Sequence, residues 1–445
     1  MKRKFLMYVI PSVSAMWIYS LYTMASGIFV AKGINEIALA SLSISMPFIN
    51  GVFALAILFA VGTSTIASIN LGNKKTDKAS EIFSMNSVIL TVISITATAA
   101  VLINLDRISY FLGATDKTIV YVRDYLRLMS LYSVFAVLTY YFEVLVKTDG
   151  HPQLATIGVG ISAVTNISLV YLFVIRMNLG IKGAALASGL SYGASTIFYL
   201  VHFIKGNSKL KFVSFKLDLS LIKRTLRLGL ADFITEFSSG FITFMFNWTI
   251  IRNIGEIGVI TYTVIVYLNS FVNMTMAGIS QGAQPLASYY YGKDEKKSYS
   301  YIFKTSVKTV ALVSLAVYAV CMIFAEKIAG IYIRSEETEL LQYSVRALRT
   351  FAPTYLLAGF NIIFVGFYSA IEKPVYSMII SIGRGLVVMS ASLMLMTELV
   401  GPNGIWMSSV VSEVVCLAGA TLIFIKLHCD DMFSGIFERQ LRVKN

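Results

Sequence analysis

Two carboxylates inside an apolar stretch are the residues with the clearest potential for chemistry. Asp232 and Glu236 stand in the segment GLADFITEFSSGFITFMFNWTII and, being four residues apart, share one face of a helix. A carboxylate at membrane depth costs a few kcal/mol, and two close together in a low dielectric do not both ionise cheaply. Such a pair can take up and release a proton or a cation, as ion-coupled exchange requires. The alternative is a structural hydrogen bond from a protonated Glu236 to a neighbouring helix.

Other polar side chains lie in apolar stretches of the same chain. Further candidates for a polar cavity are Asn247, Gln281, Gln284, Glu143, Arg384 and Glu413. Pro285 frees backbone carbonyls that need partners elsewhere and bends its helix. Any one amide could simply hold helices together, so the crowding of amides near Glu236 matters more than each alone. Arg384, between two glycines, is expected to form an ion pair with an acid such as Glu413.

The elements that carry these residues are membrane spans. The chain is 56% hydrophobic and only 14% charged over 445 residues, against roughly 25% charge in soluble domains. Apolar runs of about 20 residues predict twelve helical spans, because lipid offers the backbone no hydrogen bonds. They fall near 8–31, 37–69, 80–104, 119–146, 153–176, 181–204, 222–251, 257–290, 299–325, 340–370, 375–398 and 403–427.

The net charge of +13 indicates topology rather than nucleic-acid binding. Lys and Arg gather at the N-terminus, after spans two, six and eight, and after span twelve. These segments share one side of the membrane, so the positive-inside rule predicts that both termini are cytoplasmic. The opening MKRKFLMYVI has no convincing cleavage site and is expected to be a retained first span of a multi-pass plasma-membrane protein.

An enzyme is not expected. The chain holds three histidines and three cysteines, with no HExxH motif, no metal-ligand spacing and no phosphate-binding glycine loop. We therefore expect no cofactor, no structural metal and no use of ATP. The cysteines, Cys321, Cys416 and Cys429, imply no disulfide framework.

The chain resembles itself at a shift of 220 residues. Ile34, Glu36, Ile37, Gly62, Ala67, Ser68, Gly72, Ile82 and Phe83 all meet identical residues 220 positions later. We expect an all-α membrane protein of two six-helix lobes, related by a parallel repeat about an axis along the membrane normal. The predicted parts are an N-terminal lobe at 1–205, a cytoplasmic linker at 206–221, a C-terminal lobe at 222–427 and a tail at 428–445. Repeats of this kind place substrate between the halves and alternate access by rocking.

At this point the chain resembles the multidrug and toxic compound extrusion (MATE) family, in its Gram-positive efflux branch. The resemblance rests on RLGLADFITEFSSG, FNWTIIRNIGE, SQGAQPLASYYYG, KTDGHPQLA and LGIKGAALA, and extends over essentially all twelve spans. It implies a monomeric antiporter that exports cationic or amphipathic small molecules in exchange for H⁺ or Na⁺. By position, Glu236 matches the family's second-lobe coupling acid, with Asp232 as its helper. Asn247, Gln281 and Gln284 match polar positions of that lobe.

The chain departs from the family pattern in the first lobe. The family places an Asp in span one about fifteen residues after a proline. Here Pro11 is present, but the Asp position is Ser26. In span five Asn166 is present, but its acidic partner position is Val170. Coupling is therefore expected to rest on Glu236. The interior, rich in Met, Phe and Tyr, suits flat apolar cations.

Three rival interpretations stay open. A related flippase for lipid-linked saccharides or polymers shares repeated spans but is expected to place more basic residues in its cavity than Arg384. A major-facilitator transporter also has six plus six spans, but NLGNKKTDKA matches its loop motif only loosely. A polytopic membrane enzyme or sensor needs a segment outside the bilayer, and the loops near 105–118 and 326–339 are short.

Overall fold

The described part of the chain is mostly helical, with short turns and a non-helical linker between the helices, and no strand occurs in it. The computed structural model describes residues 1–33, 36–205, 208–331, 333 and 337–443; at 27–28, 30–33, 36–40, 43 and 427–443 only the course of the backbone is described. The tail predicted at 428–445 therefore lies outside the described side chains, and the linker predicted at 206–221 lies partly outside the described residues.

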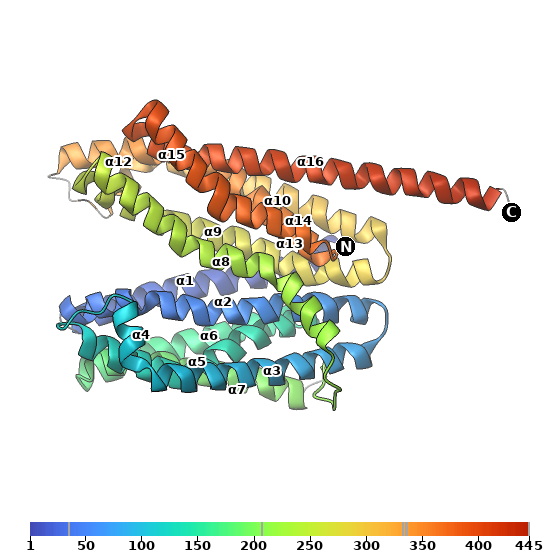
Figure 1. Ribbon diagram of the computed structural model, residues 1–445, viewed down its shortest axis with the longest axis horizontal. Helices are drawn as coiled ribbons and strands as arrows, with labels where there is room; N and C mark the ends of the chain where they lie inside the picture. Colours follow the sequence, from blue (N-terminus) through green and yellow to red (C-terminus); the bar gives the residue numbers. More distant parts are fainter. Residues whose placement is uncertain (34–35, 206–207, 332, 334–336, 444–445) are drawn as a thin grey trace.

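The first half of the chain forms one lobe, drawn in blue to green in Figure 1. Its helices are α1 (Lys2–Gly33), α2 (Glu36–Gly72), α3 (Thr76–Ile103), α4 (Leu105–Phe111), α5 (Ile119–Thr148), α6 (Pro152–Val170) and α7 (Gly180–Lys205), with a π-helical turn η1 (Tyr171–Arg176) after α6. A buried core that includes Phe83, Tyr141 and Phe142 joins α3 to α5.

The second half forms the other lobe, drawn in yellow-green to red above it (Figure 1). Its helices are α8 (Leu219–Asn253), α9 (Glu256–Gly292), α10 (Lys296–Ile323), α11 (Ala325–Gly330), α12 (Thr338–Phe351), α13 (Thr354–Ala370), α14 (Pro374–Ile382), α15 (Val388–Val400) and α16 (Pro402–Val443), with a π-helical turn η2 (Gly383–Val387) between α14 and α15. The predicted all-α fold with two lobes is confirmed.

The spans agree with the predicted ranges, with one instructive difference. Among the described residues, ten helices are long and apolar enough to cross a membrane, and α12 with α13, bent by 42°, makes an eleventh. The remaining predicted span, 222–251, is the seventh in chain order; it lies within the single helix α8 but does not meet the same criterion. Its carboxylates and amides lower its mean hydropathy, so the helix that departs from the pattern is the one that carries Asp232 and Glu236.

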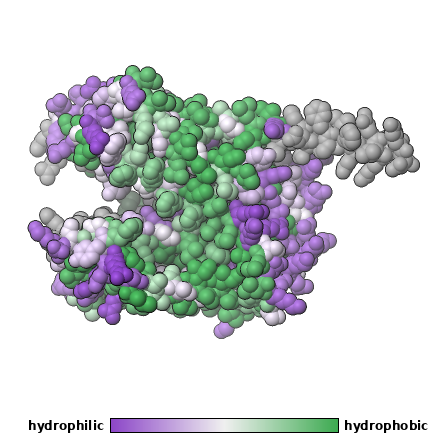
Figure 2. Space-filling model, viewed as in Figure 1, coloured by the Kyte–Doolittle hydropathy of each residue, from purple (hydrophilic) through white to green (hydrophobic). Residues whose placement is uncertain are grey.

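The two ends of the molecule differ. One end, which we call the basic end, carries the N-terminus and the turns after α2, α5, α7, α9 and α13. Its surface is strongly hydrophilic and adjoins the broad apolar band of both lobes (Figure 2). At the opposite end, which we call the open end, Figure 2 shows the surface hollowed between the two lobes. The lobes therefore meet at the basic end and separate toward the open end.

Two glycines that are mates in the 220-residue repeat lie close against the backbone of the opposite lobe at the basic end. A Cβ atom on Gly72 of α2 would lie 2.1 Å from the carbonyl oxygen of Tyr289, and one on Gly292 of α9 would lie 2.2 Å from that of Ile69. The residues contacted, Tyr289 and Ile69, are also 220 apart. We call this pair of contacts the glycine seam. Backbones can approach this closely only where both helices lack a side chain at the crossing.

Candidate functional site: carboxylates between the lobes

Helix α8 is anchored at its start and then pressed against the first lobe. Asp218 caps it, because its carboxylate accepts hydrogen bonds from the backbone N–H groups of Ser220 and Leu221. Two turns later Asn86 of α3 donates to the hydroxyl of Thr225 over 3.1 Å. A Cβ on Gly229 would lie 1.9 Å from the carbonyl oxygen of Leu58 on α2. The basic-end part of α8 therefore packs directly on the first lobe.

Asp232 and Glu236 follow within two turns of that contact. Glu236 is the central residue of α8, whose bounds are 219 and 253, and it is partly buried. Tyr140 of α5, in the first lobe, lies within electrostatic reach of Asp232 and Glu236. Tyr19 of α1 lies within reach of Glu236. The pair is thus near the middle of α8 and within reach of tyrosines of the first lobe.

Among the described residues, neither carboxylate forms an ion pair or a hydrogen bond with another side chain. Oδ2 of Asp232 is fully buried without a hydrogen bond among the described residues. Within the same part of the chain, no hydrogen bond or ion pair reaches the carboxylate of Glu236. An ionised carboxylate in such surroundings is costly unless a proton or a cation binds it. The arrangement can therefore act as a reversible site for H⁺ or a small cation.

The other acids deep in the chain are neutralised by neighbours. Lys147, one turn along α5, donates to Glu143 over 2.9 Å and is itself buried. Arg384 donates to Glu413 over 2.6 Å. This contrast separates the α8 pair from Glu143 and Glu413, which were candidates on sequence grounds: both have their charge compensated within a lobe.

Arg384 and Glu413 belong to a polar network inside the second lobe. Asn361 of α13 donates to the second oxygen of Glu413 over 2.6 Å, and Arg384 reaches the amide oxygen of Asn273 at 3.5 Å. Asn273 in turn donates to Asn269. The π-helical turn η2, which contains Arg384, packs closely on α8, because a Cβ on Gly385 would lie 2.5 Å from Ser238. The ion pair expected from the sequence is present and joins η2, α16, α13 and α9.

We expect Glu413→Gln to destabilise the protein strongly, since it leaves Arg384 buried beside a neutral amide. Removing one partner of a buried pair typically costs about 3–5 kcal/mol. Thermal unfolding in detergent measures the effect. The double variant Arg384→Met/Glu413→Gln should recover much of the loss, because the uncompensated charge is gone. Equal stability of the single variant and the wild type would contradict this role for the network.

The two glutamines of α9 face different surroundings. Gln281 donates to the hydroxyl of Tyr140 across the lobes at 3.4 Å, so it lies beside the α8 pair. Gln284 lines a small cavity inside the second lobe with Ser280, Ser306 and Phe367. Its position is therefore within the lobe rather than between lobes. Pro285 lies inside α9, which continues unbroken through it to Gly292.

The remaining candidates are spread over both lobes. Asn166 is buried and donates to Ser188 within the first lobe. Val170 is buried in an apolar cluster with Val174. Ser26 is partly buried toward the open end of α1. Asn247 is exposed and lies eleven residues after Glu236, about 16 Å farther along the same face of α8.

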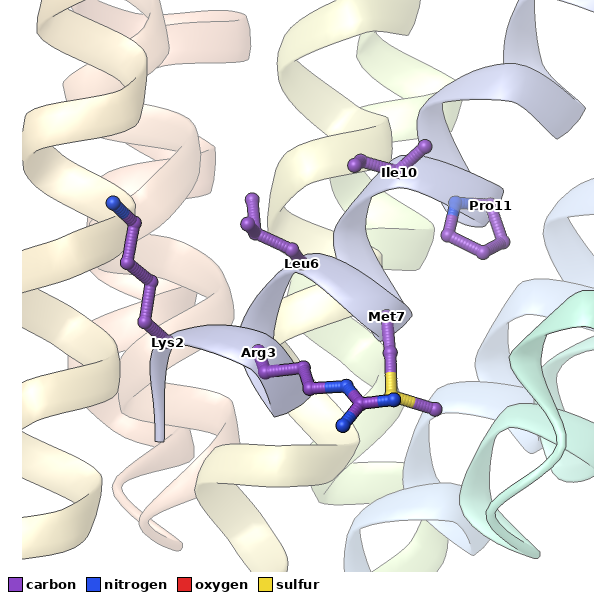
Figure 3. Close-up of a pocket in the computed structure, with 6 residues that line it drawn as sticks. All are labelled: Lys2, Arg3, Leu6, Met7, Ile10 and Pro11. Carbon is purple, nitrogen blue, oxygen red and sulfur yellow. The ribbon is translucent and has the colours of Figure 1, made fainter.

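Pro11 lies inside α1 near the basic end, and its carbonyl oxygen accepts a hydrogen bond from Thr156 of α6 over 2.7 Å. An open groove of about 570 Å³ lies on this part of α1, and Figure 3 shows the side chains that line it. Its lining comes from one helix: Lys2, Arg3, Leu6, Met7, Ile10 and Pro11. Exposed apolar side chains with cations at the helix end are typical of a membrane-facing surface, so this groove is distinct from the hollow between the lobes.

Aromatic residues of the first lobe complete the surroundings of the pair, and the sequence did not single them out. Tyr19 makes edge contacts with Tyr22 and Phe53, and Phe53 contacts Tyr192. With 25 tyrosines in the chain, composition gives no means of choosing these. Only the packing of α5 and α1 against α8 and α9 brings Tyr140 and Tyr19 to the carboxylates.

Comparison with known proteins agrees with this architecture. A profile of the MatE family matches residues 11–172 and again 232–394, so the second match begins 221 residues after the first, in accord with the internal repeat. The multidrug export protein MepA of Staphylococcus saprophyticus is 25% identical over 399 residues, which cover 86% of this chain and 85% of that protein. MepA of Staphylococcus haemolyticus is 24% identical over 398 residues, covering 88% and 86%.

Solved structures show the same fold. A crystal structure described as MATE in complex with MaL6 superposes with a TM-score of 0.91 at 22% identity, covering 96% of each chain. A structure described as the outward-facing conformation of a multidrug resistance MATE family transporter superposes with a TM-score of 0.90, also at 22% identity and 96% coverage of each chain. At this identity the likeness establishes the fold.

Proposed function

The chain belongs to the MatE family of multidrug and toxic compound extrusion transporters, and from that premise we propose that it exports cationic or amphipathic small molecules in exchange for H⁺ or Na⁺. Its relatives named multidrug export protein support the efflux of small molecules from the plasma membrane. The fine points, namely the ion, the substrate class and the coupling residue, are our inference from the site.

One observation carries the coupling proposal. Asp232 and Glu236 have no ion-pair partner among the described residues, whereas Glu143 and Glu413 form ion pairs inside their own lobes. A coupling acid must bind and release a proton or a cation during every transport cycle. A permanent ion pair would prevent that exchange. Glu236 is the main carrier in this proposal, because it is less deeply buried than the oxygen of Asp232 and lies nearer the open end of α8.

The direction of transport follows from the charge asymmetry. We place the basic end, with both termini, in the cytoplasm by the positive-inside rule. The hollow of Figure 2 then opens to the outside, so this conformation is outward-open. In that state the carboxylates can take an external H⁺ or Na⁺, and binding of the ion favours release of the drug cation. A rocking motion that closes the open end and separates the lobes at the basic end then returns the site to the cytoplasm.

The aromatic surroundings support a cationic substrate. Tyr19 lies within electrostatic reach of Glu236 and adjoins Phe53 and Tyr22. A flat organic cation can place its charge near the carboxylate and its ring against aromatic faces, with cation–π attraction of about 0.5–2 kcal/mol. Drug and coupling ion then compete for one negative site, and a single chain with two lobes suffices for transport.

The rival functions find less support. A flippase for anionic lipid-linked saccharides needs free cations at its cavity. Within the described part of the chain, the buried Lys147 and Arg384 are each paired with a glutamate. A membrane enzyme needs a catalytic set, and the acids of this site are not joined there by His or Cys among the described residues. Exchange transport is the function that the site supports best.

Ethidium efflux from intact cells tests the proposal. Cells that express the chain should extrude ethidium, and either a protonophore or removal of Na⁺ should stop them, which identifies the ion. Efflux that survives both treatments would overturn secondary coupling. Accumulation of ethidium equal to that of cells without the chain would overturn efflux itself.

A first-lobe site is tested by restoring the acids of the family pattern. We expect Ser26→Asp and Val170→Asp, singly and together, to leave the ion dependence of efflux as in the wild type. The reason is that coupling already rests on the α8 pair, and a carboxylate at 170 would enter an apolar cluster. Ethidium efflux measured against external Na⁺ and pH checks this. A new Na⁺ requirement would show that the first lobe can take part.

A further inference from the structure

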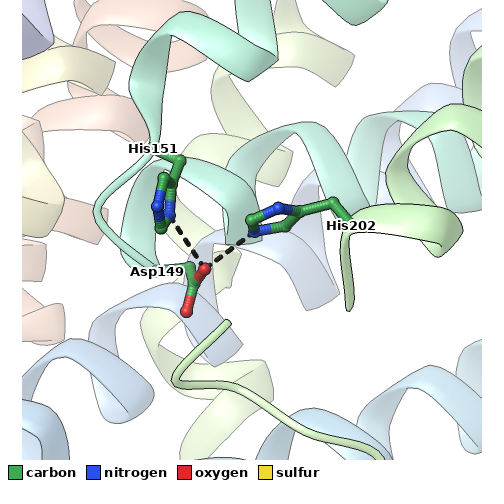
Figure 4. Close-up of side chains that lie close together, drawn as sticks. All are labelled: Asp149, His151 and His202. Carbon is green, nitrogen blue, oxygen red and sulfur yellow. Dashed lines mark hydrogen bonds and ion pairs between the residues drawn. The ribbon is translucent and has the colours of Figure 1, made fainter. Parts of the chain in front are cut away.

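Two of the chain's three histidines converge on one buried carboxylate at the basic end, away from the cleft. Asp149 ends α5, His151 precedes α6, and His202 lies in the last turn of α7. Nδ1 of His151 lies 3.1 Å from Oδ2 of Asp149, and Nε2 of His202 lies 2.8 Å from the same oxygen (Figure 4). The transport site described above does not use this cluster.

The second oxygen of Asp149 is fully engaged. Oδ1 accepts hydrogen bonds from the backbone N–H groups of Lys209, over 2.7 Å, and Leu210, over 3.1 Å. The side chain of Asp149 is 0% exposed. Outer hydrogen bonds that fix a carboxylate while leaving one oxygen toward two imidazole nitrogens are the usual support of a metal ligand. The carboxylate also holds the linker between the lobes to the first lobe.

The three ligand atoms have the spacing that a metal ion needs. Zinc lies about 2.0–2.2 Å from histidine nitrogen and carboxylate oxygen, so tetrahedral ligand atoms are about 3.3 Å apart. Here the nitrogen-to-oxygen distances are 3.1 and 2.8 Å, and all three atoms lie within 4.8 Å of one another. Small rotations of the two imidazole rings would make room for an ion between the three ligand atoms. The ion would replace the protons that the ring nitrogens now donate to Oδ2.

The chemistry of the ligands selects the class of metal. Two imidazoles and one carboxylate suit Zn²⁺ and similar divalent ions, whereas Mg²⁺ and Ca²⁺ prefer oxygen ligands alone. The side chain of His151 is 42% exposed, so an ion can enter from solvent and keep a water as fourth ligand.

We propose that Asp149, His151 and His202 form a binding site for a divalent transition-metal ion such as Zn²⁺. The ion fastens the linker, since the ligand Asp149 also binds Lys209 and Leu210. The same linker is held on α3, where Ser80 and Ser84 exchange hydrogen bonds with Lys211 and Val213. Metal binding therefore strengthens an existing attachment of the linker to the first lobe.

Titration calorimetry on the full chain tests the site. The protein is purified in detergent with a histidine-free tag, stripped with EDTA and titrated with ZnCl₂. We expect one Zn²⁺ per chain, with a dissociation constant on the order of 1 μM or lower, and no comparable heat with Mg²⁺ or Ca²⁺. His151→Gln and His202→Gln should each weaken binding at least tenfold, while both leave the bonds of Asp149 to the linker intact. Thermal unfolding without metal verifies that these variants fold.

The matched control is His428→Gln, which removes the chain's third histidine and should bind Zn²⁺ as the wild type does. Trypsin provides a second readout, because Lys209, Lys211 and Lys216 lie in the linker. Zn²⁺ should slow cleavage there in the wild type and in His428→Gln, but not in His202→Gln. Absence of saturable Zn²⁺ binding, or binding that survives both cluster variants unchanged, would overturn the proposal.

Discussion

Glu236→Gln should reduce gradient-driven ethidium efflux to the level of vesicles without the transporter, while the protein remains folded. The amide keeps the size and hydrogen-bonding capacity of the side chain but cannot carry a proton or neutralise a cation. Since no neighbour pairs with Glu236 among the described residues, its substitution leaves no uncompensated partner. The measurement is ethidium fluorescence in membrane vesicles with an imposed pH or Na⁺ gradient.

Substitutions of two other acids provide the comparison for this result. Asp232→Asn should lower efflux to an intermediate level if Asp232 assists Glu236. The exposed Glu398 at the far end of α15 supplies the matched control, since Glu398→Gln removes a carboxylate outside the site and should transport normally. Elution on size exclusion and thermal unfolding establish that each variant is folded. Unimpaired transport by Glu236→Gln would contradict the proposed role of Glu236 in ion coupling.

Transport current decides how many charges move. One H⁺ in for one monovalent cation out is electroneutral and gains nothing from the membrane potential. Two H⁺ per drug move one net charge, worth about 2.3 kcal/mol per 100 mV. A current that is present in the wild type and lost in Asp232→Asn would identify Asp232 as the second proton carrier.

Gly72→Ala together with Gly292→Ala should hold the basic end open. Each new Cβ would lie near 2.1–2.2 Å from a carbonyl oxygen of the other lobe, so the backbones must separate. Overpacking costs about 1–3 kcal/mol at each site, and two sites shift the equilibrium by roughly 30-fold or more. Alanine favours helix over glycine by up to about 1 kcal/mol, so a weakened helix cannot explain the effect.

Spin labels report the expected opening. Lys78→Cys at the start of α3 and Lys297→Cys at the start of α10 are exposed at the basic end of the two lobes, in a background without the three native cysteines. Double electron–electron resonance should show longer distances for the seam variant. Gly160→Ala with Gly193→Ala is the control, because no atom lies within 4 Å of either added Cβ. An unchanged distance distribution in the seam variant would contradict the proposed role of these contacts.

Local sequence pattern predicted the parts of this protein that depend on the membrane and on the repeat. Apolar runs predicted the spans, because a chain in lipid must satisfy its backbone hydrogen bonds within a helix. The shift of 220 residues indicated that Gly72 and Gly292 are equivalent positions. The four-residue spacing put Asp232 and Glu236 on one face. The partnership of Arg384 with Glu413 was predicted because a buried cation requires an anion.

The rest depends on how the helices face one another. Gln281 and Gln284 differ by only about 60° around a helix, yet one meets Tyr140 and the other points into the second lobe. The i, i+4 spacing of Glu143 and Lys147 permits their ion pair, but the spacing alone does not show that both side chains are buried. Without knowledge of the lobe interface, no pattern in the chain selects Tyr19 or Tyr140 from the other tyrosines.

The attachment of the linker to the first lobe limits how far the two lobes can separate at the basic end. Val213 is the last linker residue bonded to α3, and α8 begins at Leu219, so only residues 214–218 are available as a tether between the lobes. From the anchored Val213 to Leu219 there are six residue steps, which span at most about 20–22 Å when extended. In the proposed transport cycle, the lobes can separate at the basic end no farther than this tether allows on its side of the molecule. Under that proposal, the short tether also limits the size of the molecules that can enter from the basic end.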